Sequence, residues 1–133
     1  MKGSLKPVKG LPEFLADLQN HGIKTAIASF NLRKFIEEDL EVMGLQGAFE
    51  VITSAEEVQQ KKPNPEILLK TATKLGVKPE ECLFIDDAAT GIATARNARM
   101  KCIIRKTKLE QQVPDMVIED FEELTVEALN NLN

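Results

Sequence analysis

The sequence is poor in cysteine, histidine and large aromatic residues. Its 133 residues include no tryptophan or tyrosine, one histidine and two cysteines. Cys82 and Cys102 each lie inside a short apolar run, which is typical of small hydrophobic side chains in buried strands; a disulfide and a reactive thiol remain open as alternatives. A chain of this length buries a single core without disulfide or metal staples. We therefore expect one domain, spanning residues 1–133.

Long apolar runs are also absent. No stretch approaches the roughly 18 apolar residues that a membrane span requires. Residues 1–4 read Met-Lys-Gly-Ser and lead into no apolar segment that resembles a signal sequence. These two absences predict a cytoplasmic protein that does not interact with membranes.

The charge balance excludes one further class of partner. The formal net charge is −4 and the sequence pI is about 5.1, so the chain has no overall attraction for nucleic acid or anionic lipid. Apolar residues make up 43% and charged residues 29% of the chain, which is a globular composition. Seventeen lysines and arginines still suffice for a local patch, and a small anionic substrate needs only one or two of them.

Apolar periodicity predicts helices and strands in alternation. Glycines at positions 22, 44 and 76 end three of the helices, because glycine adopts the left-handed turn at a helix terminus. Alternating strands and helices favour an α/β fold, a doubly wound, mostly parallel Rossmann-like sheet with helices on both faces. The expected strands are 23–29, 49–52, 82–85, 101–104 and 116–118, and the expected helices are 11–18, 32–43, 65–75, 88–98 and a last one from 126.

Polar residues follow successive strands of this predicted sheet. Ser29 follows the first strand, Lys62 lies in the loop after the second, and Asp86 and Asp87 follow the third. Ligands bind outside the carboxyl ends of strands in open α/β sheets, so we expect these side chains to converge on one edge. A hydroxyl, an ammonium group and paired carboxylates are the components of a metal-assisted phosphate site.

Each of these residues also has a purely structural interpretation. Ser29 is a suitable cap for the next helix, and a lysine beside a proline turn is commonly just solvated. The acidic pair is harder to explain in this way. Adjacent carboxylates repel each other and a helix cap needs only one, so Asp86 and Asp87 favour a functional role.

The order of these segments resembles the haloacid dehalogenase superfamily, and within it the β-phosphoglucomutase-like phosphatases and mutases. The resemblance covers roughly residues 7–130 and rests on three segments. Ser29 follows a strand, residues 62–67 read Lys-Pro-Asn-Pro-Glu-Ile, and residues 84–92 read Phe-Ile-Asp-Asp-Ala-Ala-Thr-Gly-Ile. Receiver-type signalling domains use similar residues, but there the acidic pair comes first.

The resemblance implies a role for each matching residue. Ser29 would contact the transferring phosphoryl group, and Lys62 would steady both the nucleophile and the phosphate. Asp87 would ligate Mg²⁺ directly, with Asp86 as a second or outer ligand. The implied phosphate-binding set is Ser29, Phe30, Asn31 and Lys62.

One departure from the family pattern limits the expected activity. The family's first motif is Asp-x-Asp, whose first aspartate attacks phosphorus, and this sequence has no two aspartates two positions apart. Its aspartates are Asp17, Asp39, Asp86, Asp87, Asp115 and Asp120. The resemblance implies Mg²⁺-dependent phosphoryl transfer on a small phosphorylated metabolite, inactive or very weak in this chain alone. The alternative is a non-catalytic phosphate-binding, metal-binding or assembly module.

The resemblance also implies a gap in the sheet. The family's opening strand lies between the strands that end at Ser29 and Asp86, and we expect this strand and the helical cap to be missing here. Unpaired strand edges are a template for pairing with another chain. We expect a homo-oligomer, strand exchange, a partner strand, or direct pairing of the two strands. A smaller departure is Arg99, a non-glycine residue at an expected left-handed turn.

Overall fold

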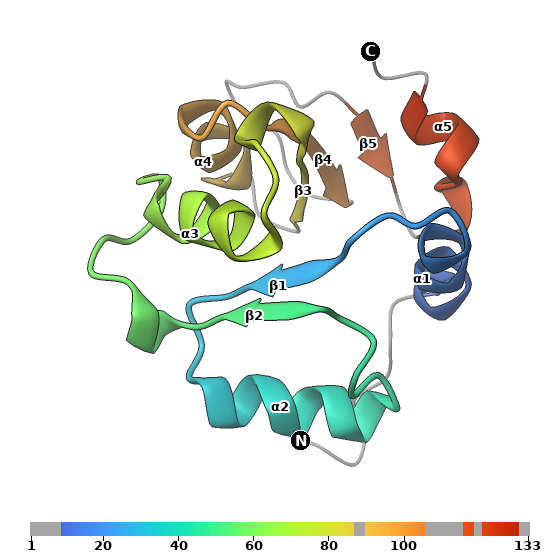
Figure 1. Cartoon of the computed structure of the whole chain (residues 1–133), viewed down its shortest axis with the longest axis horizontal. Coiled ribbons are helices and arrows are strands. Elements are labelled where there is room, and N and C mark those ends of the chain that lie inside the picture. Colours follow the sequence, from blue (N-terminus) through green and yellow to red (C-terminus); the bar gives the residue numbers. More distant parts are fainter. Residues whose placement is uncertain (1–8, 87–89, 106–115, 119–120, 131–133) are drawn as a thin grey trace.

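The chain is an α/β structure in which helices and short parallel strands alternate (Figure 1). The computed structural model describes residues 9–86, 90–105, 116–118 and 121–130. The helices are α1 (Leu11–Asn20), α2 (Arg33–Met43), α3 (Glu66–Leu75), α4 (Thr90–Asn97) and α5 (Val126–Asn130). The strands are β1 (Ala26–Ala28), β2 (Val51–Thr53), β3 (Leu83–Asp86), β4 (Lys101–Arg105) and β5 (Met116–Ile118). Short 3₁₀ turns lie at Ala55–Glu57, Pro79–Glu81 and Phe121–Glu123.

The strands form two separate parallel sheets in the described part of the chain. β1 pairs with β2, with Ile27 opposite Ile52. β3, β4 and β5 form the second sheet in that order, with Ile85 opposite Ile103. β1 and β3 share no ladder, so the direct pairing that was one way to close the expected gap is not found among the described residues.

Helices cover both faces of these sheets, because successive strand residues point to opposite faces. On one face, Phe84 and Cys102 pack with residues of α3 and α4, such as Leu68 and Ile92. On the other face, Leu83, Ile85 and Ile103 pack against Phe14 and Leu18 of α1. Ile27 and Ile52 pack against Ile36 and Leu40 of α2. The predicted doubly wound arrangement is therefore confirmed.

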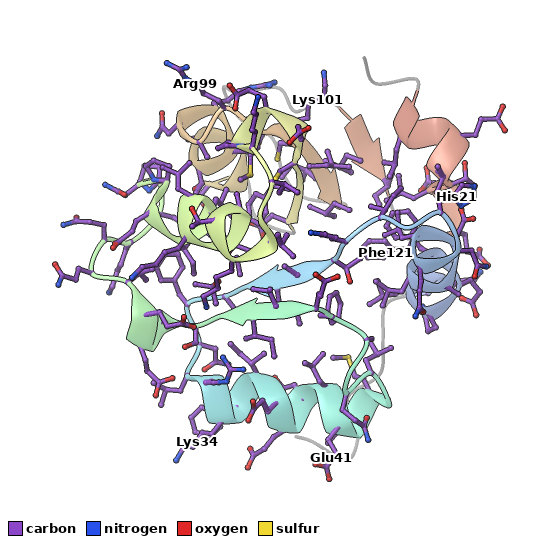
Figure 2. All side chains as sticks on the ribbon, in the orientation of Figure 1. His21, Lys34, Glu41, Arg99, Lys101 and Phe121 are labelled. Atoms are coloured by element: carbon purple, nitrogen blue, oxygen red, sulfur yellow. The ribbon has the colours of Figure 1, made fainter. Side chains whose placement is uncertain are left out.

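The helix ends follow the glycine positions expected from the sequence. Gly22, Gly44 and Gly76 have φ of 69°, 74° and 72°, the left-handed region that glycine enters without steric cost. Arg99 is the one described non-glycine residue with positive φ, at 63°, which costs on the order of 1 kcal/mol. This positive φ confirms the expected left-handed turn at Arg99. The side chain projects outward from the turn between α4 and β4 (Figure 2).

Two strands differ in extent from the expected ranges. β1 begins at Ala26, not at residue 23, and Ile23 is 41% exposed. All three residues of β1 are half-buried rather than buried, because β2 is the only described strand that pairs with it. β2 begins at Val51, two residues later than expected.

The remaining expectations concern α3, the cysteines and membrane spans. α3 begins at Glu66, one residue later than expected, while Asn64 Oδ1 still accepts a hydrogen bond from the Glu66 N–H at 3.0 Å. Cys102 is buried in β4, Cys82 is half-buried just before β3, and both are free thiols. No helix in the described ranges has the length and apolar character to cross a membrane.

Candidate phosphate and metal site

The turn after β1 is held by its own side chains. The Ser29 N–H donates to the Thr53 carbonyl at 3.0 Å, which continues the ladder between β1 and β2. Ser29 Oγ accepts a hydrogen bond from the Asn31 N–H at 3.2 Å, and Asn31 Oδ1 accepts one from the Leu32 N–H at 3.0 Å. Neither side chain bonds the free N–H groups inside the first turn of α2, and Glu56 Oε1 accepts from the Arg33 N–H instead. Ser29 is therefore not the helix cap that its position allowed.

Lys62, in the loop that follows β2, and Asp86, at the end of β3, meet at the carboxyl ends of the strands. Lys62 Nζ lies 2.7 Å from Asp86 Oδ2, and the two side chains are only 22% and 19% exposed. Lys62 Nζ also lies 5.3 Å from the centroid of the Phe84 ring, within the range of a cation–π interaction. This ion pair joins the loop that follows β2 to the end of β3. The sequence thus correctly predicted that these two residues converge.

Asp86 depends on a close approach to the first turn of α4. A Cβ added to Gly91 would lie 2.5 Å from Asp86 Oδ2 and 2.7 Å from Asp86 Cβ. Real Cβ atoms essentially never come this close to another heavy atom, so any larger residue at this position would displace the carboxylate. Gly91 therefore leaves the space that the Asp86 carboxylate occupies, a role that its place in the third segment did not indicate.

A carboxylate behind the loop holds the lysine segment in place. Glu66 Oε1 accepts hydrogen bonds from the N–H groups of Gln59 and Gln60, at 2.9 and 2.8 Å. These backbone bonds lower the pKa of Glu66 below its ordinary value. On the other side of the loop, Asn97 Nδ2 donates to the Pro63 carbonyl at 2.9 Å. The loop that presents Lys62 is thus fastened to both α3 and α4.

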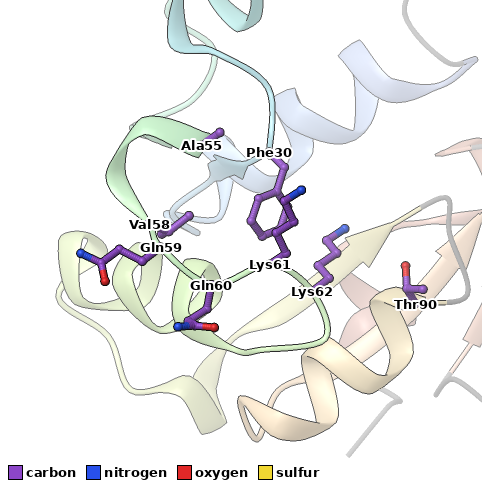
Figure 3. A pocket seen from close by; sticks show the side chains of 8 residues that line it. All are labelled: Phe30, Ala55, Val58, Gln59, Gln60, Lys61, Lys62 and Thr90. Atoms are coloured by element: carbon purple, nitrogen blue, oxygen red, sulfur yellow. The ribbon is translucent and has the colours of Figure 1, made fainter.

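A cavity of about 480 Å³ opens beside Lys62 (Figure 3). It lies at the carboxyl ends of the strands, where sequence reasoning placed the site. Lys61 and Lys62 give it two ammonium groups, while Phe30 and Val58 give it apolar walls. Ser29 and Asn31 do not line it, although they flank Phe30 in the chain. The lining residues are Phe30, Ala55, Val58, Gln59, Gln60, Lys61, Lys62 and Thr90.

Only Phe30 and Lys62 of these eight lining residues were site candidates, and the uncharged polar residues that were missed are Gln59, Gln60 and Thr90. Gln59 and Gln60 precede the two lysines, and Thr90 lies between the acidic pair and Gly91. The sequence could have indicated these residues only through their position next to the segments that carry the family resemblance. Uncharged amides and a hydroxyl carry no pattern of their own, so their placement depends on the loop geometry.

The described residues contain one of the two expected metal ligands. Asp86 lies at the end of β3, and Asp87 lies outside the described residues. No group of three or more histidine, cysteine, aspartate or glutamate residues gathers in the described ranges. Mg²⁺ is commonly held by one or two carboxylates, with water and substrate phosphate completing its octahedron. A carboxylate oxygen at this edge fits that pattern, but not a cage made of protein ligands alone.

Comparison with known proteins gives matches to one hydrolase family and to phosphatases. The sequence profile of the haloacid dehalogenase-like hydrolases matches residues 1–105. The chain is 36% identical over 119 residues to the Bacillus subtilis protein YhcW, which is named as a phosphatase, covering 90% of this chain and 53% of that protein. It is 31% identical over 111 residues to hexitol phosphatase B of Escherichia coli, covering 84% and 50%. The chain therefore spans about half the length of these relatives.

Solved structures agree on the fold. β-Phosphoglucomutase from Clostridium difficile superposes with a TM-score of 0.86 at 26% identity, over 94% of this chain and 55% of that one. CbbY from Rhodobacter sphaeroides, whose structure was solved with phosphate, superposes with a TM-score of 0.85 at 23% identity, over 94% and 59%. The second likeness concerns the fold alone. Together with the family profile, these matches establish that the chain belongs to the haloacid dehalogenase-like hydrolases.

Proposed function

We propose that this chain supplies the phosphate-contacting and metal-holding edge of a Mg²⁺-dependent phosphoryl-transfer site. The observation that carries the proposal is the pair formed by Lys62 and Asp86, at 2.7 Å, beside a cavity with a second lysine in its wall. A cation and a carboxylate in contact at the carboxyl ends of parallel strands provide one group for phosphate and one for a metal. The family membership of the chain makes phosphoryl transfer the reaction class that this pair serves.

The individual roles follow from the chemistry of each group. The Lys62 ammonium offsets negative charge on a phosphoryl oxygen. Ser29, with the neighbouring backbone N–H of Phe30, donates hydrogen bonds to phosphoryl oxygens. For Ser29 this only requires its hydroxyl proton to point outward, because Oγ accepts the local hydrogen bond.

Asp86 and Asp87 are the proposed metal ligands. When bound, Mg²⁺ would neutralise charge that develops on the transferred phosphoryl group. Lys62 competes with the metal for Asp86, because Asp86 Oδ2 already lies 2.7 Å from the lysine. We therefore expect Mg²⁺ to bind weakly in the absence of phosphate. Phosphate would draw the lysine toward itself and strengthen metal binding.

The substrate class is proposed only broadly, as a small phosphorylated metabolite. One relative is named hexitol phosphatase B, and another, from Aquifex aeolicus and 31% identical, is named phosphoglycolate phosphatase. These names describe different organic groups attached to the same phosphate. The shared element is therefore the phosphate, which is the part that Lys62 would recognise.

We further propose that the 133-residue chain by itself turns over very slowly. It contains no Asp-x-Asp, the motif whose first aspartate attacks phosphorus in this family. Removing the nucleophile from an enzyme that works through a covalent intermediate costs on the order of 10⁴ to 10⁶ in rate. Phosphate binding without measurable turnover is the behaviour expected of this chain.

A titration with inorganic phosphate and Mg²⁺, followed by NMR of the ¹⁵N-labelled chain, tests the proposal. We expect the amide signals of residues 29–31 and 61–62 to shift, and Lys62→Met to weaken phosphate binding at least tenfold. Lys78→Met, which removes an exposed lysine from the turn before β3, is the matched control and should bind phosphate like the original chain. Equal phosphate affinity in both variants would refute the proposed role of Lys62.

A second measurement separates binding from catalysis. Hydrolysis of p-nitrophenyl phosphate by the same preparations should not exceed that of the Lys62→Met variant. If the original chain hydrolyses this ester rapidly and Lys62→Met does not, the proposed site is right and the proposed inactivity is wrong. If phosphate binds without hydrolysis, the chain acts as a binding module in isolation.

A further inference from the structure

Lys61 differs from its neighbour Lys62 in having no partner of opposite charge. Lys62 Nζ lies 2.7 Å from Asp86 Oδ2, and its side chain is mostly covered. Lys61 is exposed, and its ammonium group makes no hydrogen bond or ion pair with any residue that the structure describes. The cavity beside Lys62 therefore has one cation that is already paired and one that is not.

The two ammonium groups serve the same cavity. Lys61 and Lys62 both line it, and their side chains leave the loop on the same side (Figure 3). The amides of Gln59 and Gln60 point away from these two nitrogen atoms in the same view. Consecutive Cα atoms lie about 3.8 Å apart, so two lysine side chains that start side by side can reach two anionic groups only a few bonds apart in one ligand.

The walls around Lys61 leave its charge uncompensated. None of the described lining residues carries a carboxylate. Phe30 and Val58 give the cavity apolar surface, and both pack against the core cluster that contains Leu68 and Ile92. Apolar walls keep water from part of the cavity, and the attraction between opposite charges grows as the effective dielectric constant falls. An anion beside Lys61 is therefore held more strongly than one beside a fully solvated lysine.

The segment that carries Lys61 is fixed before any ligand binds. Glu66 Oε1 accepts hydrogen bonds from the backbone N–H groups of Gln59 and Gln60, directly before the two lysines. Asn97 Nδ2 donates to the Pro63 carbonyl directly after them. A ligand that contacts Lys61 thus has to order one side chain and not a loop, which lowers the entropic cost of binding.

We infer that Lys61 binds a second anionic group of the substrate, so that the site takes phosphate esters that also carry a carboxylate or a second phosphate. The inference rests on the proposed function, in which Lys62 contacts the transferred phosphate. Lys62 is committed to Asp86 and to that phosphate, which leaves Lys61 for the charge on the rest of the substrate. The substrate class narrows from any small phosphorylated metabolite to one with two separate anionic groups.

The overall charge of the chain makes this preference measurable. At a net charge of −4, the chain as a whole repels a ligand more strongly as the ligand gains negative charge. Tighter binding of the more highly charged ligand therefore requires a cation close to it. An exposed ion pair changes an equilibrium by roughly twofold to fivefold, and the apolar walls favour the upper end of this range.

Pairs of phosphate esters that differ in one group provide the test. The first pair is 3-phosphoglycerate and glycerol 3-phosphate, in which a carboxylate replaces a hydroxymethyl group. The second pair is fructose 1,6-bisphosphate and fructose 6-phosphate, which tests a second phosphate. NMR titration of the ¹⁵N-labelled chain, at low ionic strength and equal free Mg²⁺, gives the affinities. We expect the more highly charged member of at least one pair to bind about fivefold more tightly, and that pair identifies the anionic group.

Three variants assign this preference to Lys61. Lys61→Met should bring the affinity ratio of that pair to about one, whereas Lys61→Arg keeps the positive charge and should retain the preference. Lys78→Met removes an exposed lysine from the turn before β3 and lowers the net charge by the same amount. It should leave the ratio as it is in the original chain.

The outcomes separate this inference from the proposed function. The inference is overturned if neither pair shows a preference, or if Lys61→Met and Lys78→Met give the same ratio. Inorganic phosphate has no second anionic group and tests Lys62 alone. If Lys62→Met weakens its binding while the ratio does not depend on Lys61, only the inference is wrong. If Lys62→Met leaves its binding unchanged, the proposed function is wrong, and the inference that rests on it is overturned too.

Discussion

The two sheets of this molecule differ in how well their strands are buried. β4 has a strand on each side, and its residues Cys102, Ile103 and Ile104 are 0% exposed. β1 has a strand on one side, and all three of its residues are half-buried although two helices pack near it. Both runs are apolar, Ala-Ile-Ala in β1 and Cys-Ile-Ile in β4. Burial of a parallel strand therefore requires neighbours on both edges as well as cover on both faces.

The largest predicted effect comes from truncating one isoleucine in each sheet. Ile103→Ala should lower the free energy of unfolding by about 3–4 kcal/mol, because a fully enclosed side chain leaves a cavity. Ile27→Ala should cost only about 1–2 kcal/mol, since part of that side chain is already in contact with solvent. Urea unfolding followed by circular dichroism measures both changes.

The same pair of variants tests whether the two sheets differ in solution as they do in the structure. Equal losses for Ile27→Ala and Ile103→Ala would mean that β1 is as well buried in solution as β4, which contradicts the comparison.

The second prediction compares the residues that follow or end one strand of each sheet, Asp86 at the end of β3 and Ser29 just after β1. Asp86 lies in close contact with a helix, whereas Ser29 makes one local hydrogen bond. Gly91→Ala should destabilise the chain by about 2 kcal/mol, because the new Cβ would meet the Asp86 carboxylate at 2.5 Å. Helix propensity alone favours alanine by about 1 kcal/mol, so the clash decides the sign. Ser29→Ala, at the end of β1, should cost less than about 1 kcal/mol, because Ser29 Oγ accepts one local hydrogen bond.

A double variant tests whether contact with Asp86 is the cause of the destabilisation by Gly91→Ala. In an Asp86→Gly background both the carboxylate and the Cβ that obstruct this position are gone, so Gly91→Ala should become neutral or slightly stabilising. Thermal unfolding of the four chains completes the cycle. If Gly91→Ala destabilises both backgrounds equally, the cause lies elsewhere in α4 and Asp86 is not held by this close approach.

Much of the fold could be predicted because its signals are local. Gly44 and Gly76 end α2 and α3 as expected, and the short β5 lies at the predicted residues. The meeting of Lys62 and Asp86 was also predictable, because parallel strands bring their carboxyl ends to the same edge.

The rest depends on contacts between segments that are distant in sequence. An apolar run such as residues 23–29 does not reveal whether a neighbouring strand exists, so the exposed Ile23 and the short β1 were not anticipated. The bonds from Glu66 to the loop before Lys62 depend on where α3 begins. The sequence showed that Gly91 belongs to a recognisable segment. It could not show that Gly91 lies against the Asp86 carboxylate, because that contact depends on how α4 packs against β3.

The smallest predicted effect concerns an ion pair that joins the 3₁₀ turn after β2 to α3. Glu57 pairs with Lys74 and also accepts a hydrogen bond from the Ser54 N–H at 2.9 Å, and the Lys74 contact is the main reason that the pKa of Glu57 is lowered. A lowered carboxyl pKa stabilises the fold above the ordinary glutamate pKa of about 4.3. This stabilisation is lost as the pH falls through the lowered folded-state value.

Glu57→Gln should therefore reduce stability at pH 7 by about 1 kcal/mol or less, because both partners are partly exposed and screened. It should also flatten the decline of stability below about pH 4.3, since one titrating group has been removed. Lys74→Met removes the main cause of the shift and should flatten the same part of the profile. Urea unfolding between pH 3 and pH 7 measures these slopes, and an unchanged slope in Glu57→Gln would show that the pair does not link pH to stability. The second sheet contains no part of this pair, so the pH effect on stability should be unaltered by Ile103→Ala.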